Sequence, residues 1–130
     1  MTTPSRIKRE MPQRYRLEAG KCQNCGAVHY PPRLICRDCR SKSMETIQLS
    51  KSCKLITHTI IEVPPGPFVD EAPYAVGIVE TDEGARLTCQ VVDVDFDKLK
   101  PGFALRLEFR LIQSVGEDGV LCYGHKAVPA

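Results

Sequence analysis

The sequence predicts a mainly β protein with a short N-terminal helix, a small cysteine-rich module and a five-stranded barrel. Two cysteine pairs lie within residues 17–42, and from residue 53 the apolar residues alternate with a period of two. That period is typical of β-strands with one buried face. We therefore divide the chain into a helical segment at 1–16, the cysteine-rich module at 17–50 and the barrel at 51–130.

The composition limits the class of protein. The chain has 130 residues, of which 42% are hydrophobic and 26% are charged, with a formal net charge of +2. These values exclude a fully disordered chain. No apolar run approaches the roughly 20 residues of a membrane-spanning helix, and the first residues lack the apolar core of a secretory signal. We therefore expect a cytoplasmic protein without a membrane partner.

The charges are divided unevenly along the chain. Residues 1–54 carry 12 Lys and Arg against 4 Asp and Glu, whereas residues 55–130 carry 6 against 12. This division indicates two modules with a basic face on the first. Such a face suits nucleic acid, an acidic protein surface or a phosphate-bearing cofactor, or it is a solvated charged surface.

Two segments flank the cysteines. Residues 5–16 are polar and charged, and a short helix there has a narrow apolar face that needs another surface to lie on. Residues 43–54 predict a short strand or connector.

The cysteines are the strongest motif. Cys22 and Cys25 form one C-x-x-C pair, Cys36 and Cys39 form another, and ten residues separate the pairs. Each pair makes a tight turn, or knuckle, that presents two thiolates, and Gly26 suits a backbone position with positive φ. Two knuckles supply the four ligands of a tetrahedral zinc ion.

A metal held by four protein ligands has no open position for substrate, so we expect a structural zinc site. The metal replaces the core that a segment of this size cannot build. Iron is the rival metal, because tetrahedral sulfur sites also hold it.

The other cysteines and the histidines show no catalytic pattern. A nucleophilic cysteine needs a nearby base, for which His58 and His125 are the candidates, and His29 is interpreted as a surface residue. The chain has no Gly-rich phosphate loop, G-x-S-x-G or H-E-x-x-H motif. The remaining cysteines lie in or beside predicted strands and are interpreted as small buried hydrophobes: Cys53, Cys89 and Cys122.

Five alternating runs predict the barrel strands, at residues 53–63, 74–80, 86–92, 105–111 and 120–128. In the first run one face is expected to carry Leu55, Thr57, Thr59, Ile61 and Val63.

Five strands with an interruption after the third fit an OB-fold, in competition with other small barrels. The interruption is residues 93–100, for which we predict a turn of helix. Ligands of OB-folds usually meet the loops after strands one and four, which are residues 64–73 and 114–119 here.

Several segments together resemble a known family: Pro12–Leu17, Gly20–Gly26, Tyr30–Arg33, Cys36–Cys39, Ala72–Tyr74 and Glu83–Arg86. The chain resembles the acyl-CoA-associated family that joins a rubredoxin-like zinc ribbon to an OB-fold, and the resemblance spans nearly its whole length. Arg40 departs from it, because many ribbons have glycine after the second knuckle.

The resemblance implies a non-catalytic partner of thiolase-superfamily enzymes. Archaeal relatives bridge acetoacetyl-CoA thiolase and HMG-CoA synthase in the mevalonate pathway, so the resemblance implies the same two partners and acetoacetyl-CoA passing between them. Contact with CoA itself stays open, and the resemblance transfers no CoA-binding residue.

The basic N-terminal segment is the expected docking surface, because Arg and Tyr are favoured at protein interfaces. The residues concerned are Arg14, Tyr15, Arg16 and Arg33. Two alternatives stay open. One is a nucleic-acid binder, which the acidic barrel with few aromatic residues disfavours. The other is an enzyme with an unrecognised site.

Overall fold

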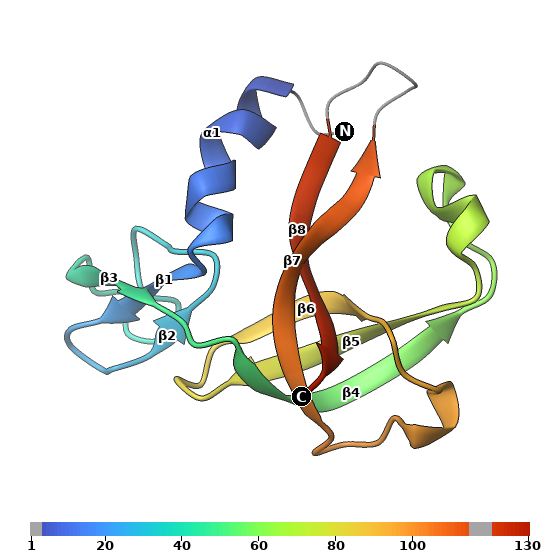
Figure 1. Cartoon of the computed structure of the whole chain (residues 1–130). Helices are drawn as coiled ribbons and strands as arrows, with labels where there is room; N and C mark the ends of the chain where they lie inside the picture. The colour runs from blue at the N-terminus through green and yellow to red at the C-terminus, as the bar shows by residue number, and fades with distance from the viewer. Residues whose placement is uncertain (1–3, 115–120) are drawn as a thin grey trace.

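The computed structural model describes residues 4–114 and 121–130 of the chain. None of the helices in these residues is long and apolar enough to cross a bilayer. The elements follow one another as α1 (Pro4–Tyr15), β1 (Glu18–Cys22), β2 (Val28–His29), β3 (Met44–Gln48), β4 (Ser52–Ile61), the 3₁₀ helix η1 (Gly66–Glu71), β5 (Tyr74–Thr81), β6 (Arg86–Val91), the 3₁₀ helix η2 (Phe96–Lys98), β7 (Ala104–Ser114) and β8 (Leu121–Pro129) (Figure 1).

The N-terminal helix lies on the barrel, as its narrow apolar face requires. Ile7 is 6% exposed, and together with Met11 it lines a small cavity shared with Tyr123 of β8. On the solvent side Glu10 pairs with both Arg6 and Arg14, each four residues away. Such pairs each stabilise a helix by about 0.2–0.5 kcal/mol, so the packing contributes most of the stability.

The cysteine-rich module is a small antiparallel sheet in the order β2-β1-β3. Gly20 of β1 faces His29 of β2 on one side and Thr46 of β3 on the other. A Cβ at Gly20 would lie 3.3 Å from Cε of Met44, so only glycine fits without displacing that side chain. This sheet holds the first knuckle at the end of β1.

The five remaining strands close into a barrel in the order β4-β5-β6-β8-β7, which confirms the mainly β class and the OB-fold. The antiparallel ladders β4–β5, β5–β6 and β7–β8 are long. Closure between β6 and β8 is parallel and consists of a single bridge, Val91 to Ala127. The barrel is therefore closed at one end of these two strands and split at the other.

The predicted face of the first barrel strand is wrong beyond Leu55. A register shift between Leu55 and Thr57 in β4 adds a residue to the ladder, so Leu55 is buried whereas Thr57 is exposed. Ile60, from the other predicted face, packs against the core. Val63 lies beyond the end of the strand and is 90% exposed, because the prolines that follow it cannot continue a ladder.

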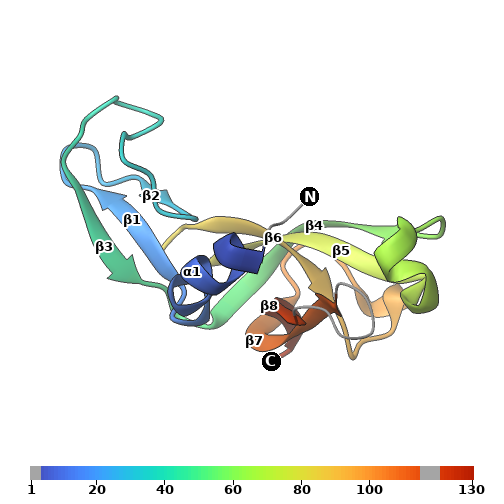
Figure 2. The same cartoon turned by 90° about the horizontal axis from the view of Figure 1, so that it is seen from above.

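One hydrophobic core crosses from the small sheet into the barrel. Leu17, Ala19 and Leu49, which flank or belong to the small sheet, share a cluster with Leu55 and Leu107 of the barrel. The backbone N–H of Leu49 also donates to the carbonyl of Leu17 at 2.9 Å. Seen from above, the small sheet projects to one side of the barrel (Figure 2). The division at residues 16/17 and 50/51 stays a prediction.

The connections are as follows. The loop at 64–73 contains η1, and η2 confirms the predicted helical turn within 93–100. The predicted ligand loop at 114–119 lies almost wholly outside the described residues.

Candidate metal centre and exposed surfaces

The two knuckles have the same backbone geometry. In the first, Gly26 N–H donates to the Cys22 carbonyl at 3.0 Å; in the second, Arg40 N–H donates to the Cys36 carbonyl at 3.0 Å. Both turns place the residue after the second cysteine in the left-handed region, with φ of 78° at Gly26 and 62° at Arg40. Glycine adopts this conformation freely, whereas a side chain costs about 1–2 kcal/mol there. Arg40 therefore makes the same turn at a cost in stability.

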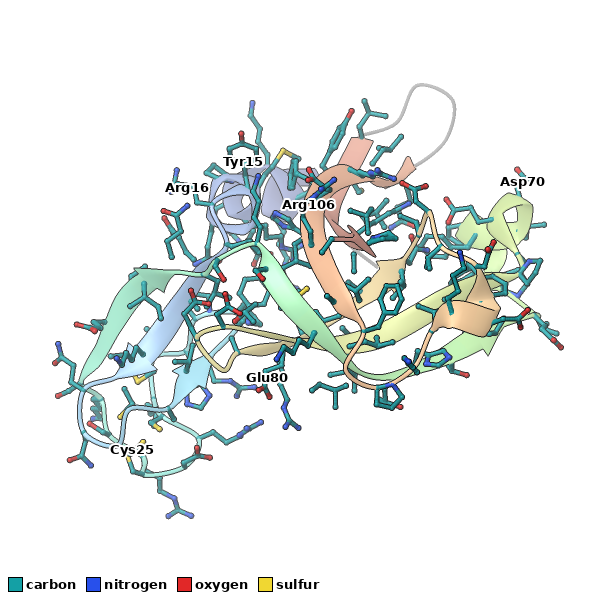
Figure 3. The ribbon with its side chains drawn as sticks, turned by 60° about the horizontal axis from the view of Figure 1, so that its bottom comes forward. Tyr15, Arg16, Cys25, Asp70, Glu80 and Arg106 are labelled. Carbon is teal, nitrogen blue, oxygen red and sulfur yellow. The ribbon has the colours of Figure 1, made fainter. Side chains whose placement is uncertain are left out.

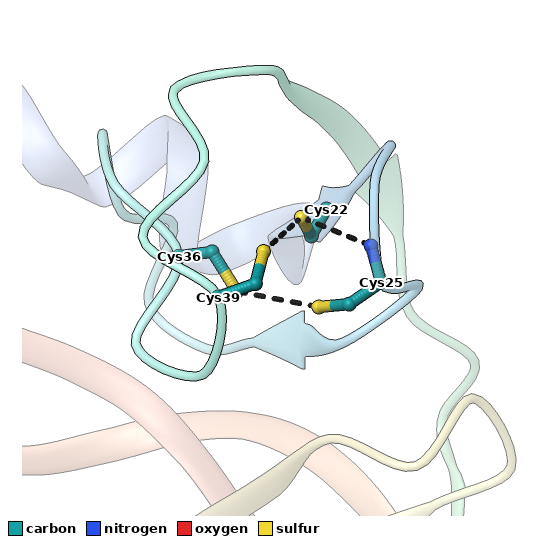
Figure 4. Close-up of side chains that lie close together, drawn as sticks. All are labelled: Cys22, Cys25, Cys36 and Cys39. Atoms are coloured by element: carbon teal, nitrogen blue, oxygen red, sulfur yellow. Dashed lines mark hydrogen bonds between the residues drawn. The ribbon is translucent and has the colours of Figure 1, made fainter.

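The knuckles bring the four cysteine sulfurs within 4.8 Å of one another (Figure 4). Sγ of Cys22 lies 3.4 Å from Sγ of Cys39, and Sγ of Cys25 lies 3.5 Å from Sγ of Cys36. Cys22 and Cys36 are buried, Cys39 is half-buried and Cys25 is exposed. The four cysteines are positioned to bind a metal ion, as their spacing predicts.

Hydrogen-bond donors around the four cysteines favour the thiolate form of Cys22 and Cys39. The Asn24 side chain and the Ser41 backbone N–H lower the pKa of Cys39 to about 6, and the Cys25 backbone N–H lowers the pKa of Cys22. The Ala27 N–H also lowers the pKa of Cys25, but the Cys36 sulfur, burial and the other sulfurs outweigh it and raise that pKa to about 12. Four adjacent sulfurs cannot all ionise without a cation between them. The donor set therefore fits a divalent metal.

The prediction that His29 is a surface residue is wrong. The side chain is 5% exposed, and its Nε2 lies 3.4 Å from Sγ of Cys36. The reason is the register of the small sheet, which pairs His29 with Gly20 and turns the imidazole toward the second knuckle. His29 is therefore a buried hydrogen-bond partner of the Cys36 sulfur.

Burial makes two of the other cysteines poor nucleophiles. Cys53 and Cys89 are buried, as predicted, and burial raises their pKa values to about 11 and about 12. Both side chains are therefore neutral thiols at pH 7. Cys122 is half-buried.

The four predicted interface residues are exposed. Arg14 and Arg16 are each paired with a glutamate, Glu10 and Glu18 respectively. Tyr15 is 63% exposed, with its ring edge-on to Phe109 at 5.1 Å between centroids. Tyr15 and Arg16 lie at the end of α1, whereas Cys25 marks the far end of the small sheet (Figure 3). Arg33 is exposed in the loop between β2 and β3. That these four residues form an interface stays a prediction.

Two exposed apolar surfaces were not predicted from the sequence. The first, which we call the ribbon tip, lies between the knuckles and consists of Leu34 and Ile35, which are 90% and 50% exposed. The second, which we call the hairpin patch, lies on α1 and the β7–β8 hairpin and consists of Tyr15, Phe109, Leu111, Leu121 and Tyr123. The only sequence signal for the ribbon tip is an apolar pair in a short, otherwise polar loop.

Comparisons with known proteins agree with both modules. Residues 9–45 match the family described as the ChsH2 rubredoxin-like zinc ribbon domain, and residues 46–110 match the ChsH2 C-terminal OB-fold domain.

Relatives from archaea match over almost the whole chain. A protein of Methanothermobacter thermautotrophicus is 43% identical over 99% of this chain and 98% of its own. A protein of Methanocaldococcus jannaschii is 41% identical over 93% of this chain and 86% of its own. Both are named DUF35 domain-containing scaffold protein.

Solved structures have the same fold. A chain of the Ltp2-ChsH2(DUF35) aldolase is 26% identical and superposes with a TM-score of 0.72, covering 92% of this chain and 89% of its own. A DUF35 family protein of Sulfolobus solfataricus superposes with a TM-score of 0.58 at 19% identity, covering 82% and 78%. The chain thus belongs to the DUF35 family, in which a ChsH2-type rubredoxin-like zinc ribbon precedes an OB-fold domain.

Proposed function

We propose that Cys22, Cys25, Cys36 and Cys39 bind a structural zinc ion. Four cysteine sulfurs close enough to coordinate a single ion are typical of a zinc site. With all four coordination positions filled by protein, the ion has no open position for a substrate. Iron in the same site would give a coloured protein. Metal analysis of the purified chain distinguishes the two, and one zinc per chain is the expected result.

We propose that the protein is a non-catalytic cytoplasmic scaffold that holds acetoacetyl-CoA thiolase and HMG-CoA synthase together. The full-length similarity to relatives named scaffold proteins supports a scaffold role. The absence of an activated nucleophile among Cys53 and Cys89 is consistent with a chain that performs no reaction. The choice of these two enzymes rests on the family resemblance of the sequence.

Two separate apolar surfaces are the observation that carries the bridging proposal. The ribbon tip and the hairpin patch lie on different modules, and both expose large apolar side chains to solvent. Exposed apolar clusters on a small protein are typical of protein interfaces. A bridge needs two such surfaces, whereas a protein with one partner needs only one.

The benefit of a bridge follows from the chemistry of the pathway. Condensation of two acetyl-CoA molecules is unfavourable, so the second enzyme must draw acetoacetyl-CoA away. A scaffold that holds both enzymes close raises the effective concentration of acetoacetyl-CoA at the second site without adding a catalytic group.

Substitution of each surface in turn tests the bridge. Leu34→Asp changes the ribbon tip and Leu121→Asp changes the hairpin patch. Val63→Asp is the matched control, because Val63 is 90% exposed beyond the end of β4, outside both surfaces and both predicted ligand loops. Each variant is mixed with both purified enzymes from the same organism and analysed by size-exclusion chromatography. We expect wild type and the control to form a ternary complex, and each test variant to lose a different enzyme.

Two outcomes would contradict the proposal. If the wild-type chain binds neither enzyme, the choice of partners is wrong. If one substitution releases both enzymes, the two surfaces do not act as separate docking sites. Salt-sensitive binding of a labelled oligonucleotide would instead favour the nucleic-acid alternative.

A further inference from the structure

One edge of β6 is open over most of its length. β6 pairs with β5 from Arg86 to Val91, but within residues 4–114 and 121–130 its other edge pairs only at Val91, with Ala127 of β8. The two strands separate on the N-terminal side of that bridge, where β8 continues into the hairpin with β7 (Figure 1). An open edge offers a row of backbone donors and acceptors to another strand.

The register identifies the residues that face the open side. Thr81 N–H donates to the Ala85 carbonyl at 2.9 Å, so Thr81 and Ala85 form a hydrogen-bonded pair of the antiparallel ladder. Such pairs recur at every second residue, so Leu87 and every second residue after it direct their backbone groups toward β5. Arg86, Thr88 and Gln90 therefore point their backbone groups the other way. The bond from Val92 N–H to the Ala127 carbonyl, which lies on the same side, agrees with this assignment.

A cavity of about 690 Å³ lies beside this edge. Thr88 and Gln90 of β6 line one side, His125 of β8 lines another, and Glu10 and Arg14 of α1 line a third. The cavity therefore occupies the split between β6 and β8, with the helix alongside.

Side-chain atoms in this cavity also lack partners. Among the described residues, the buried polar side-chain atoms without a hydrogen bond belong to Thr81, Gln90 and His125. Gln90 and His125 line the cavity, on the two strands that separate, and their unpartnered atoms are buried within its wall. Buried polar atoms without partners cost free energy, so these three atoms mark a place where a hydrogen-bonding group is expected.

We propose that the open edge of β6 binds an extended segment of a partner enzyme, which adds to the barrel as a further strand. This inference rests on the proposed scaffold function. An extended chain is the occupant that fits, because it presents backbone donors and acceptors at the spacing of Arg86 and Thr88 and an acceptor for the N–H of Gln90, whose carbonyl belongs to the bridge with β8. Rotation of the Gln90 and His125 side chains, which line the cavity, would bring their unpartnered atoms to this segment.

The lining defines the chemistry of the segment. Val76, Leu87 and Ile112 give the cavity an apolar side. Arg6 and Arg14 also border it, but both pair with Glu10, and the Gln90 side chain donates to Glu71 at 3.2 Å. The segment therefore has apolar side chains toward the barrel.

Two variants with one control test the inference. Thr88→Pro removes an N–H that faces the open side, so the ladder with β5 keeps its bonds, while an added strand loses one bond and meets the proline ring. Thr88→Val keeps the N–H and is the control. His125→Phe removes the two unpartnered nitrogens and keeps an aromatic ring against Phe109, so the free chain stays folded.

Binding of each variant to acetoacetyl-CoA thiolase and to HMG-CoA synthase is measured by titration, and amide hydrogen exchange is followed in the free and bound wild-type chain. We expect Thr88→Pro and His125→Phe to weaken binding of one enzyme at least tenfold, and Thr88→Val to bind like wild type. In the complex, amide exchange in residues 86–90 slows at least tenfold.

The outcomes separate this inference from the scaffold function. A complex that forms with both variants unimpaired, and with exchange in 86–90 unchanged, overturns the open-edge inference and leaves the scaffold standing. Failure of the wild-type chain to bind either enzyme overturns both. Slowed exchange on addition of CoA alone assigns the cavity to a small molecule and likewise overturns the inference.

Discussion

At the scale of single residues, the imidazole of His29 contacts one of the four clustered cysteine sulfurs. With a proton on Nε2, His29 donates to Sγ of Cys36 over 3.4 Å and stabilises the thiolate. Removing such a supporting group typically costs 10–100-fold in metal affinity. We expect His29→Phe to lower zinc affinity by roughly tenfold or more in a chelator competition, and His29→Gln, which keeps a donor, to lose less. Equal affinity in all three proteins would show that the contact is incidental.

His125 makes stability depend on pH. Burial, assisted by Lys51 and opposed by Glu108, lowers the pKa of its imidazole from 6.5 to about 4. Between pH 6.5 and pH 4, His125 is therefore protonated in the unfolded chain but neutral in the folded chain. The free energy of unfolding is highest above pH 6.5 and decreases as the pH falls toward 4. We expect a loss of about 2 kcal/mol, allowing for solvent around the half-buried ring.

The measurement compares urea unfolding of wild type and His125→Phe between pH 7 and pH 4. The wild-type free energy of unfolding should fall more steeply than that of the variant, which lacks the titrating group. Parallel curves would mean that His125 does not titrate differently on folding.

The two histidines also show where residue-level prediction ends. The cysteine ligands were identifiable because the C-x-x-C spacing is local and repeats. Burial of His29 depends on pairing with Gly20 across the small sheet, and the environment of His125 depends on α1 and β8 meeting. Neither contact leaves a local pattern in the sequence.

At the scale of elements, the knuckles hold the cysteine-rich module together. Its sheet has short strands, and β2 has only two residues, so we expect a metal bound by the four cysteines to supply much of the stability of this module. We expect Cys39→Ser to lose the metal and to make the amides of β1–β3 exchange freely in hydrogen-exchange measurements. Ser41→Ala, beside the knuckle but outside the ligand set, is the control. A Cys39→Ser protein with full metal content and wild-type protection would show that the metal is dispensable.

Strands were easier to predict than their faces. All five barrel strands follow from alternation and turn residues, because each is a local pattern. The bulge in β4 reverses the faces after Leu55, and an alternation of apolar residues with threonines contains no sign of it. The unpaired edge of β6 likewise depends on the path of β8, which pairs with β6 only at Val91, and no local sequence pattern determines that path.

At the scale of the whole molecule, the scaffold is expected to change flux without changing either enzyme. With thiolase and synthase at dilute concentrations, adding this chain should raise the rate of HMG-CoA formation while the kcat of each enzyme alone stays constant. A trap enzyme that consumes free acetoacetyl-CoA distinguishes channelling, because it should inhibit the reaction less when the chain is present. Equal inhibition with and without the chain would contradict the proposed role.

The overall architecture was accessible from the sequence, but the surfaces that it presents were not. The charge division predicted a basic first module, yet Arg6, Arg14 and Arg16 are paired with glutamates. The ribbon tip and the hairpin patch combine residues whose exposure depends on the packing of the whole chain. Composition therefore predicted the modules, and tertiary structure determined where partners can dock.

The core that Leu17, Ala19 and Leu49 share with the barrel has a consequence for the assembly. A flexible linker between the two modules would let bound partners rotate relative to one another, so that only the average distance between their active sites would be controlled. A continuous core instead holds the two modules rigidly together, so both the angle and the distance between them are fixed. If the chain bridges two enzymes as proposed, this rigidity would fix the direction in which the active site of one enzyme faces that of the other.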